Sequence, residues 1–509
     1  MKRTLLAILA GLGLAAVARA DGGSPPTPTE VRLSLRECVH LALNHNLDIE
    51  ISRYQPWIDD QGLRAAFGTF DHVLYADGSS GRSRAGAKDF FAGAATLSAD
   101  DSTFRTGLRR TLPAGVIYDL SLSVERDHSN STFLLLDPAW QSSLGLSLTV
   151  PVLRGAGEEA NGTAIVLARN TRRLSVTQFE KLLTDTVFSV QEAYWALVAA
   201  IEQKRFRDQA LEVAKKLLED NRRRFERGTL AKVDVTEAEA GVASQIEGIL
   251  TAENDVQDAM DRLKRLADPA LLREDSRIIP LDGPREAGQD LDERSAIENG
   301  LKDAMDRRPE YRGLFVEIDS QDRTVSRAQN DTLPRLNAVA SGSLLGLEDD
   351  FSGSGRELRS GDTYSWSAGV VLEIPLENRS ADGALRRAEL ERRRLILRRR
   401  NLEDQILVEV REAVRAIKTT ERRIEATRQA RVLAREQFDG EMSRREAGLR
   451  TTFHVLDARS KLTDAETREV KARVDYAAAW AGYRRSAGTL LGEYGILVEP
   501  NLVPRQAAR

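Results

Sequence analysis

The chain has 509 residues, of which 30% are charged and 41% hydrophobic, with one cysteine and a formal net charge of −4. This composition excludes a disordered chain, a disulfide scaffold and a structural metal site built from several cysteines. The near-neutral charge gives no sign of a general nucleic-acid-binding protein, which would be basic.

The first 20 residues are predicted to be a secretory signal peptide. Lys2 and Arg3 precede an apolar run over residues 5–17, and small residues occupy positions 18 and 20. A membrane-anchoring helix is the disfavoured alternative, because about 13 apolar residues fall short of the roughly 20 that span a bilayer. Residues 21–32 are expected to form a linker, and Cys38 to be a helix residue of no special role.

Two very long helices dominate the expected structure. The segment between about 162 and 227 lacks proline and glycine, and a second helix of similar length is predicted over about 384–447. In the first, mostly apolar positions recur at steps of four and three, the spacing of a coiled-coil seam. That seam comprises Phe179, Leu183, Thr186, Val190, Ala193, Leu197, Ala200, Lys204, Arg207, Leu211, Ala214, Leu218, Asn221 and Phe225.

Each long helix meets a glycine, Gly228 or Gly448, and a further helix follows, over about 232–266 and 452–490. The sequence therefore predicts two long helical hairpins, 162–266 and 384–490.

Short segments that alternate apolar and small polar residues lie between the helices. Period-two alternation predicts strands whose two faces meet different media, in a soluble sandwich or in a barrel in lipid. The predicted strands cover 70–79, 104–112, 116–126, 142–150, 335–345 and 363–374. The Gly-, Ser- and Asp-rich segments 81–102, 127–141 and 346–361 are predicted to be loops.

The chain reads as an internal duplication. Residues 224–228 match 444–448 at an offset of 220, and each half reads helix, strands, long helix, glycine turn, helix. The predicted repeats are 33–268, with strands over about 70–150, and 293–491, with strands over about 335–374. A linker rich in proline and acidic residues, 269–292, separates them, and 492–509 forms a tail.

The position of the strands favours a membrane barrel. At the end of a helical stem roughly 100 Å long, no helical layer is available to cover them, so closure buries both faces and both edges. The smallest membrane barrels need about eight strands, so several copies must pool theirs. The sequence predicts an obligate, hollow oligomer.

Three segments resemble the TolC family of outer-membrane efflux proteins. Residues 33–46 resemble the family's first helix, and 448–458, Gly-Leu-Arg-Thr-Thr-Phe-His-Val-Leu-Asp-Ala, resemble its pore-tip motif, with 228–238 as the partner turn. The resemblance covers nearly the whole mature chain. It implies a mainly α fold with a β-barrel section: a long α-helical coiled-coil barrel, a trimeric transmembrane β-barrel and an internal two-fold repeat.

The resemblance also implies a function. The chain would be the passive, porin-like exit duct of a tripartite efflux or type I secretion system, located in the outer membrane of a Gram-negative-type bacterium and reaching into the periplasm. Its partners would be a periplasmic adaptor (membrane fusion) protein, an inner-membrane RND or ABC pump and outer-membrane lipid. No catalytic residue, cofactor, metal ligand or nucleic-acid site is predicted. The alternative is a secreted or periplasmic coiled-coil scaffold or adaptor without a barrel.

The resemblance assigns a gate to the helical tips, at the turns Gly228 and Gly448. Arg450 of the second turn would pair with Asp234 of the first and latch the closed state, and Glu237 belongs to the same gate. Two acidic residues that ring the family's pore map onto His454 and Asp457, so the expected negative ring is weakened. One hypothesis is that His454 makes closure sensitive to pH; the alternative is a solvated histidine beside a turn.

The first half departs from the family by two additional strand candidates, 104–112 and 116–126. One hypothesis is six strands per protomer and eighteen per trimer, instead of the family's four and twelve. The alternative is an extracellular hairpin outside the barrel.

Overall fold

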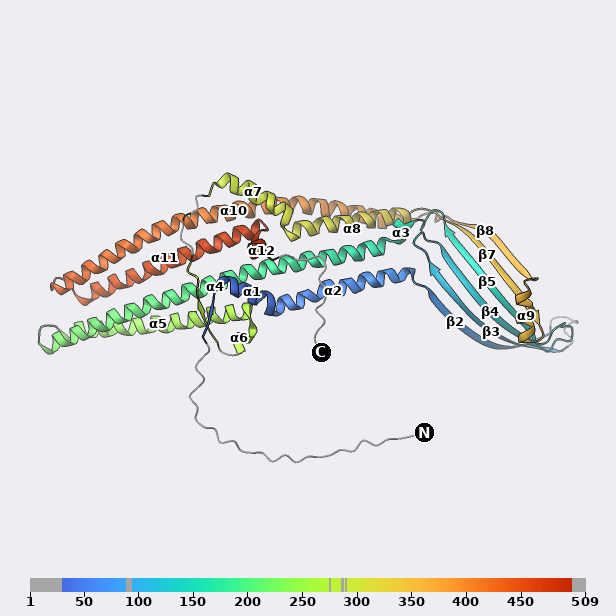
Figure 1. The fold of residues 1–509 in the computed structure, drawn as a ribbon, viewed down its shortest axis with the longest axis horizontal. Helices are drawn as coiled ribbons and strands as arrows, with labels where there is room; N and C mark the ends of the chain where they lie inside the picture. The colour runs from blue at the N-terminus through green and yellow to red at the C-terminus, as the bar shows by residue number, and fades with distance from the viewer. Residues whose placement is uncertain (1–29, 88–93, 274–275, 285–287, 289–290, 497–509) are drawn as a thin grey trace, which may run out of the picture.

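The computed structural model describes residues 30–87, 94–273, 276–284, 288 and 291–496. The predicted signal peptide and most of the N-terminal linker and C-terminal tail lie outside the described residues. The chain is elongated, with helices along most of its length and a sheet at one end (Figure 1).

Two helical hairpins form the end of the rod opposite the sheet. Helix α4 (Thr163–Glu226) packs against α5 (Lys232–Ala267), and α10 (Arg379–Glu446) packs against α11 (Thr452–Ser486). Helix α4 also packs along α11, so the four helices lie side by side in the order α5, α4, α11, α10. With 64 residues, α4 is about 96 Å long. The predicted long helices and hairpins are confirmed.

Shorter helices cover the half of the rod nearer the sheet. Helices α1 (Leu35–His45) and α2 (Leu47–Phe67) pack on α4, while α7 (Glu293–Arg307) and α8 (Pro309–Asp331) pack on α10. Helix α8 also contacts α4, and the short helix α12 (Leu490–Glu493) lies against α4 as well. Asn46 sets the bend between α1 and α2, because its side chain accepts the amides of Asp48 and Ile49 and caps α2.

The largest apolar core lies where α1, α4, α5 and α11 meet. Tyr194, Val190 and Leu197 of α4 are fully buried there, with Cys38 and Val39 of α1. The predicted seam is buried from Phe179 to Leu197. Farther along the helix, the buried positions include Phe206, Ala210 and Leu217 instead of Arg207, Leu211 and Leu218. The predicted seam is therefore buried only in part there, at Ala214 and Asn221, since α4 has two neighbours, α5 and α11, rather than one.

The predicted linker between the halves contains regular structure. Strand β6 (Arg277–Pro280) pairs in parallel with β1 (Glu30–Leu33), and α6 (Pro269–Arg273) follows α5. Within the predicted linker, β1 supplies the backbone partners that β6 needs.

Six strands form one antiparallel sheet in the order β2-β3-β4-β5-β7-β8. They are β2 (Val73–Gly86), β3 (Thr96–Thr111), β4 (Ile117–Ser129), β5 (Ala139–Pro151), β7 (Arg335–Glu348) and β8 (Tyr364–Glu373). The two additional strands, β3 and β4, lie inside the sheet between β2 and β5. The hypothesis of six strands per protomer is confirmed, and the separate hairpin is wrong.

Several predicted loop boundaries are wrong. Residues 81–86 and 96–102 extend β2 and β3, because their backbones pair with each other. Phe70 lies in a short 3-10 helix, Gly68–Phe70, rather than in a strand. Within the predicted loop 346–361, α9 (Phe351–Ser360) is a helix capped by the Asp350 carboxylate, which accepts the Gly353 amide at 2.6 Å.

No helix in the described part of the chain is both long enough and apolar enough to cross a bilayer.

Candidate functional site

Both helical hairpins turn at a glycine in the left-handed conformation. Gly228 and Gly448 each have φ of 75°. The Gly228 amide donates to the carbonyl oxygen of Phe225 at 2.8 Å, and the Gly448 amide to that of Arg445 at 3.0 Å. A side chain with a Cβ is strained in this conformation, so glycine ends each helix where the chain reverses. The two turns form the tips at the end of the rod opposite the sheet (Figure 1).

The residues predicted to latch the tip belong to different hairpins. Arg450 directs its Nε atom to Oε2 of Glu441 on α10, at 3.4 Å. Asp234 and Glu237 lie in the first turns of α5, where no described side chain forms an ion pair or hydrogen bond with either carboxylate. Arg450 and Asp234 do not pair within one protomer. A latch between Arg450 and the Asp234 of another copy stays a prediction.

His454 and Asp457 lie three residues apart in the first turns of α11. Nδ1 of His454 is 3.1 Å from Oγ1 of Thr451, and its ring meets Phe453 edge-on. The Asp457 carboxylate pairs with Lys461, one turn farther along, at 2.9 Å. Because Lys461 offsets the charge of Asp457, a negative ring built from this position is weaker than the family motif implies. The pore roles of His454 and Asp457 stay predictions.

A buried polar cluster lies just inside the tips and was not predicted from the sequence. Arg445 of α10 is 6% exposed, and its Nη2 atom donates to Asp220 Oδ2 at 2.8 Å and to Asn221 Oδ1 at 2.9 Å. Asn221 Nδ2 donates to Oγ1 of Thr452 at 2.8 Å and to the carbonyl oxygen of Asp234 at 3.0 Å. The cluster therefore joins the tip-proximal ends of α4, α5, α10 and α11.

The sequence offers only an indirect signal for this cluster, a difference between the two turns. Arg445 occupies the position in the second turn that Phe225 occupies in the first, at the offset of 220. Phe225 is 44% exposed, whereas Arg445 is buried. Since arginine is ordinarily found at the surface, burial at a turn is not evident from the residue type.

A second buried charged pair lies farther along α11, and one of its members contacts the other hairpin. Arg459 and Glu466 of α11 approach to 3.6 Å, with side chains 5% and 11% exposed. Burial raises the pKa of the Glu466 carboxyl and lowers the pKa of the Arg459 guanidinium. Arg459 also donates to the carbonyl oxygen of Phe206 on α4, at 3.2 Å. Protonation of Glu466 would therefore alter a contact between the two hairpins.

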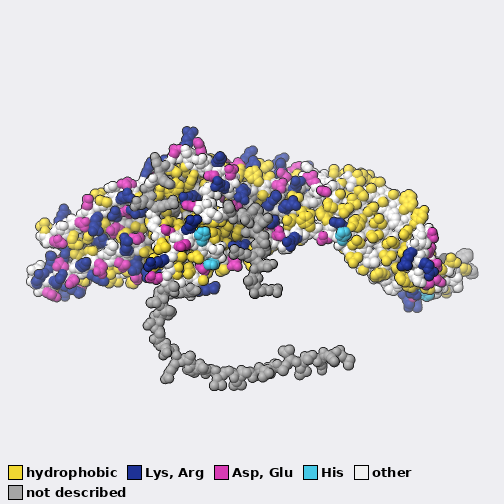
Figure 2. Space-filling model, viewed as in Figure 1, with side chains coloured by type: hydrophobic (Ala, Val, Ile, Leu, Met, Phe, Trp, Pro, Cys, Tyr) yellow, Lys and Arg dark blue, Asp and Glu magenta, His cyan; other side chains and the backbone are white. Residues whose placement is uncertain are grey.

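The two faces of the six-stranded sheet differ in polarity. Paired residues share a face, and successive residues alternate between faces. One row of paired residues on the apolar face is Leu122, Leu144, Leu344 and Tyr364, and one row on the other face is Asp119, Ser147, Ser341 and Ser367. Apolar side chains prevail over the strands, whereas charged side chains prevail over the helices (Figure 2). Such a sheet fits lipid on one side and water on the other.

The polar face carries its own network across β2, β3 and β4. The Tyr75 hydroxyl donates to Asp119 at 2.8 Å, and Arg109 Nε donates to the same carboxylate at 2.7 Å. A Cβ at Gly107 would collide with the Tyr75 ring, so glycine lets this ring lie against the strand. These charges are paired with one another. In the described part of the chain, no three His, Cys, Asp or Glu side chains gather as metal ligands would.

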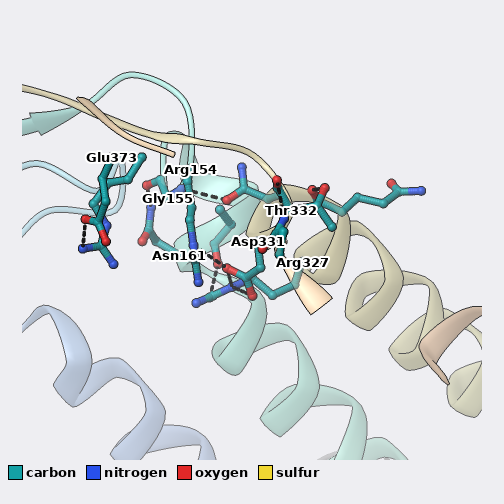
Figure 3. Close-up of polar contacts among 12 residues, drawn as sticks. Arg154, Gly155, Asn161, Arg327, Asp331, Thr332 and Glu373 are labelled. Atoms are coloured by element: carbon teal, nitrogen blue, oxygen red, sulfur yellow. Dashed lines mark hydrogen bonds and ion pairs between the residues drawn. The ribbon is translucent and has the colours of Figure 1, made fainter. Parts of the chain in front are cut away.

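Polar contacts fix the sheet to the helices (Figure 3). Asp331, the last residue of α8, pairs with Arg154 at 3.6 Å and with Arg327 at 3.2 Å. Asn161 Nδ2 donates to the carbonyl oxygen of Gly155 at 2.8 Å. These contacts tie the connection between β5 and α4 to the end of α8, so the sheet and the helical rod meet through a defined junction.

Known proteins resemble this chain in sequence and in fold. The outer membrane protein TolC of Vibrio cholerae is 24% identical over 65% of this chain and 74% of its own length. The alkaline protease secretion protein AprF of Pseudomonas aeruginosa is 28% identical over 62% of this chain and 64% of its own. The solved CmeC outer membrane channel of Campylobacter jejuni matches with a TM-score of 0.64 and 16% identity, covering 90% of this chain and 86% of CmeC.

A family model gives the assignment. The model described as "Outer membrane efflux protein" matches residues 118–267 and 300–489, which include the strands β5, β7 and β8 and both helical hairpins. The chain belongs to the outer membrane efflux protein family.

Proposed function

We propose that this chain forms a passive exit duct that crosses the outer membrane and extends through the periplasm. The single observation that carries this function is a sheet with one apolar and one polar face, placed at the end of a rod of long helices. Lipid would cover the apolar face and water the polar face. The helical hairpins then continue the water-filled path away from the membrane.

Closure of the duct requires further copies of the chain. Strands β2 and β8 each pair on one side only within the described residues, so both edges of the sheet are open. An open edge in lipid leaves backbone groups without hydrogen bonds, which is costly. We propose a homotrimer in which β2 of each copy pairs with β8 of the next, giving a barrel of eighteen strands.

Exposed apolar side chains on the two flanks of the rod support this arrangement. Ile51 and Ile58 lie seven residues apart on α2, and Leu390 and Leu397 lie seven residues apart on α10. All four are between 59% and 69% exposed. Ile58 and Leu390 also lie at similar distances from the ends of their helices at the sheet. The two stripes would therefore meet between neighbouring copies.

The partners follow from the proposed duct. A passive channel takes its energy from elsewhere, so we propose an inner-membrane RND or ABC pump and a periplasmic adaptor that docks at the helical tips. AprF is named for the secretion of a protease, so a polypeptide cargo stays open beside small molecules. At the tips, the cluster around Arg445 would hold the two hairpins of each copy together, and Arg450 would pair with Asp234 of a neighbour.

Disulfide cross-linking tests the trimer. The double variant Ile51→Cys/Leu397→Cys should oxidise to a species of three linked chains, since the two positions face each other across copies. Ile51→Cys/Leu433→Cys is the matched control, because Leu433 is exposed but lies far nearer the tip. Cys38 does not interfere, as it is fully buried. Monomers in both variants would refute the proposed arrangement.

Membrane fractionation and conductance test the duct. The full chain should fractionate with the outer membrane, show heat-modifiable gel mobility and conduct in planar bilayers. A scaffold without a barrel would do none of these. Conductance between pH 5 and pH 8 should differ between the wild type and His454→Ala if His454 controls closure, and identical profiles would remove that role.

A further inference from the structure

Helix α9 packs on the apolar face of the sheet, at the end remote from the helical rod. Ser142 and Gly346 are paired across β5 and β7 on the apolar face. The Ser354 hydroxyl lies 2.9 Å from that of Ser142, and a Cβ at Gly346 would collide with the Ser354 carbonyl oxygen. Phe351 meets Trp140 edge-on at 5.8 Å between ring centroids. The helix is therefore seated on the outer wall of the proposed barrel.

Aromatic residues mark the depth of α9 relative to the proposed membrane. Tyr364 and Trp366 lie on the apolar face of the neighbouring strand β8, and they are 67% and 72% exposed. Exposed aromatic residues in membrane barrels gather at the level of the lipid headgroups. Tyr364 pairs with Leu344, two residues before the glycine on which α9 rests, so α9 lies at headgroup level or just beyond it.

Two of the acidic groups around α9, Glu357 and Asp350, are engaged in its structure. The Glu357 carboxylate accepts the Leu347 amide at 2.6 Å and the Thr363 hydroxyl at 3.1 Å. The Asp350 carboxylate caps the N-terminus of the helix. The acidic side chains Glu348 and Asp349, at the turn between β7 and α9, are exposed.

The arginines of α9 face outward instead. Arg356 and Arg359 are exposed and lie three residues apart, on one side of the helix, and neither forms an ion pair with a described residue. Arg126 of β4 lies near the start of α9, since its guanidinium is 5.9 Å from the centre of the Trp140 ring, which Phe351 contacts. Figure 2 shows basic side chains at this end of the sheet, beyond the apolar zone.

We propose that Arg356 and Arg359 bind the phosphate groups of the lipid in the outer leaflet around the barrel. A guanidinium presents a planar fork of donors that matches phosphate oxygens. The lipid of that leaflet is a phosphorylated glycolipid, so its phosphates lie at the depth of α9. This inference rests on the proposed outer-membrane function.

Binding of purified lipid A to the full chain in detergent tests the proposal. We expect bisphosphorylated lipid A to bind more tightly than dephosphorylated lipid A, as measured by native mass spectrometry. Arg356→Gln/Arg359→Gln should weaken binding about 25-fold, because each cationic side chain at an anionic lipid surface contributes roughly fivefold. Arg356→Lys/Arg359→Lys should keep only the part of the affinity that charge alone supplies, because lysine lacks the planar fork of donors. The control Arg294→Gln/Lys302→Gln removes two exposed charges from α7 and should change nothing.

Further measurements separate the possible outcomes. Equal binding of both forms of lipid A by a chain that conducts in planar bilayers overturns this inference and leaves the proposed duct intact. A chain that neither inserts nor conducts overturns both. Full competition by inorganic phosphate would indicate an anion site rather than a lipid site. Loss of binding in EDTA would indicate a divalent cation bridging to Glu348 and Asp349. Either result refutes direct recognition of lipid by the arginines.

Discussion

Replacing Arg445 by methionine should loosen the tips of the two hairpins. The substitution keeps the length of the side chain but removes the donors that reach Asp220 and Asn221. A hydrogen bond to a charged group contributes about 1.5–3 kcal/mol. Asp220 keeps a second partner, Arg224 at 3.1 Å, and its side chain is 27% exposed, so we place the loss near 2 kcal/mol. That value corresponds to about a 30-fold shift toward tips that have separated.

Planar-bilayer recordings of the purified protein would measure this shift as a larger open fraction. Arg444→Met is the matched control, because the Arg444 side chain on the same helical turn is 58% exposed and pairs only with Glu441 among the described residues. If Arg445→Met and Arg444→Met open as rarely as the wild type, the cluster does not hold the tips and the reasoning is refuted.

Three further predictions concern the helical stem. Gly448→Ala should lower the midpoint of thermal unfolding, since left-handed backbone costs a residue with a Cβ about 1–2 kcal/mol, whereas Gly440→Ala inside α10 should raise it; two shifts of the same sign would contradict this. Burial raises the pKa of Glu466, so its contribution to stability is present below the ordinary pKa of a glutamate and is lost as pH rises through the raised value. Glu466→Gln should remove this loss, and parallel curves of stability against pH for the two proteins would refute it. Cys38 is fully buried, and burial raises its pKa to about 12, so a thiol reagent should label it only after denaturation, and rapid labelling of the native chain would exclude the packing described.

The long helices and two of the strands could be predicted because local sequence patterns determine them. The run without glycine or proline that forms α4 stops before Gly228, and α10 stops before Gly448. Both glycines adopt the left-handed conformation with which the chain leaves the helix. Hydrophobic alternation over 142–150 and 363–374 likewise located β5 and β8. In each case the residues that determine the element lie inside it, so no partner had to be known.

The outer parts of the sheet could not be predicted because their partners determine them. Residues 81–86 of β2 and 96–102 of β3 are polar and rich in glycine and serine, which is the composition of loops. They are strands because each supplies the other's backbone hydrogen bonds. Helix α9 contains Gly353 and Gly355, poor helix formers, and it exists where Ser354 can pack on Gly346. Such pairing is a property of the tertiary structure.

The candidate gate at the tips also depends on partners that the local sequence does not identify. The family motif directed attention to Arg450, which the structure places against Glu441. The residue that joins the helices within one protomer is Arg445, five positions earlier, and its role depends on Asp220 and Asn221 more than 200 residues away. A motif identifies residue types near the turn. Which of those residues are buried is determined by the packing of the two hairpins.

The additional hairpin β3–β4 changes how the sheet fits the helices beneath it. Each of four strands, β2, β5, β7 and β8, is connected to a helix. Strands β3 and β4 are joined to each other by a turn instead. This turn contacts the β5–α4 connection, where the Gly157 amide donates to the Ala114 carbonyl oxygen. Four helices side by side at 8–10 Å occupy about 32–40 Å of circumference. Six strands about 4.8 Å apart and tilted by about 40° occupy roughly 38 Å, whereas four would occupy only about 25 Å. In the proposed trimer, six strands per copy therefore let the barrel continue the helical tube at nearly constant width, where four would require a marked narrowing at the junction.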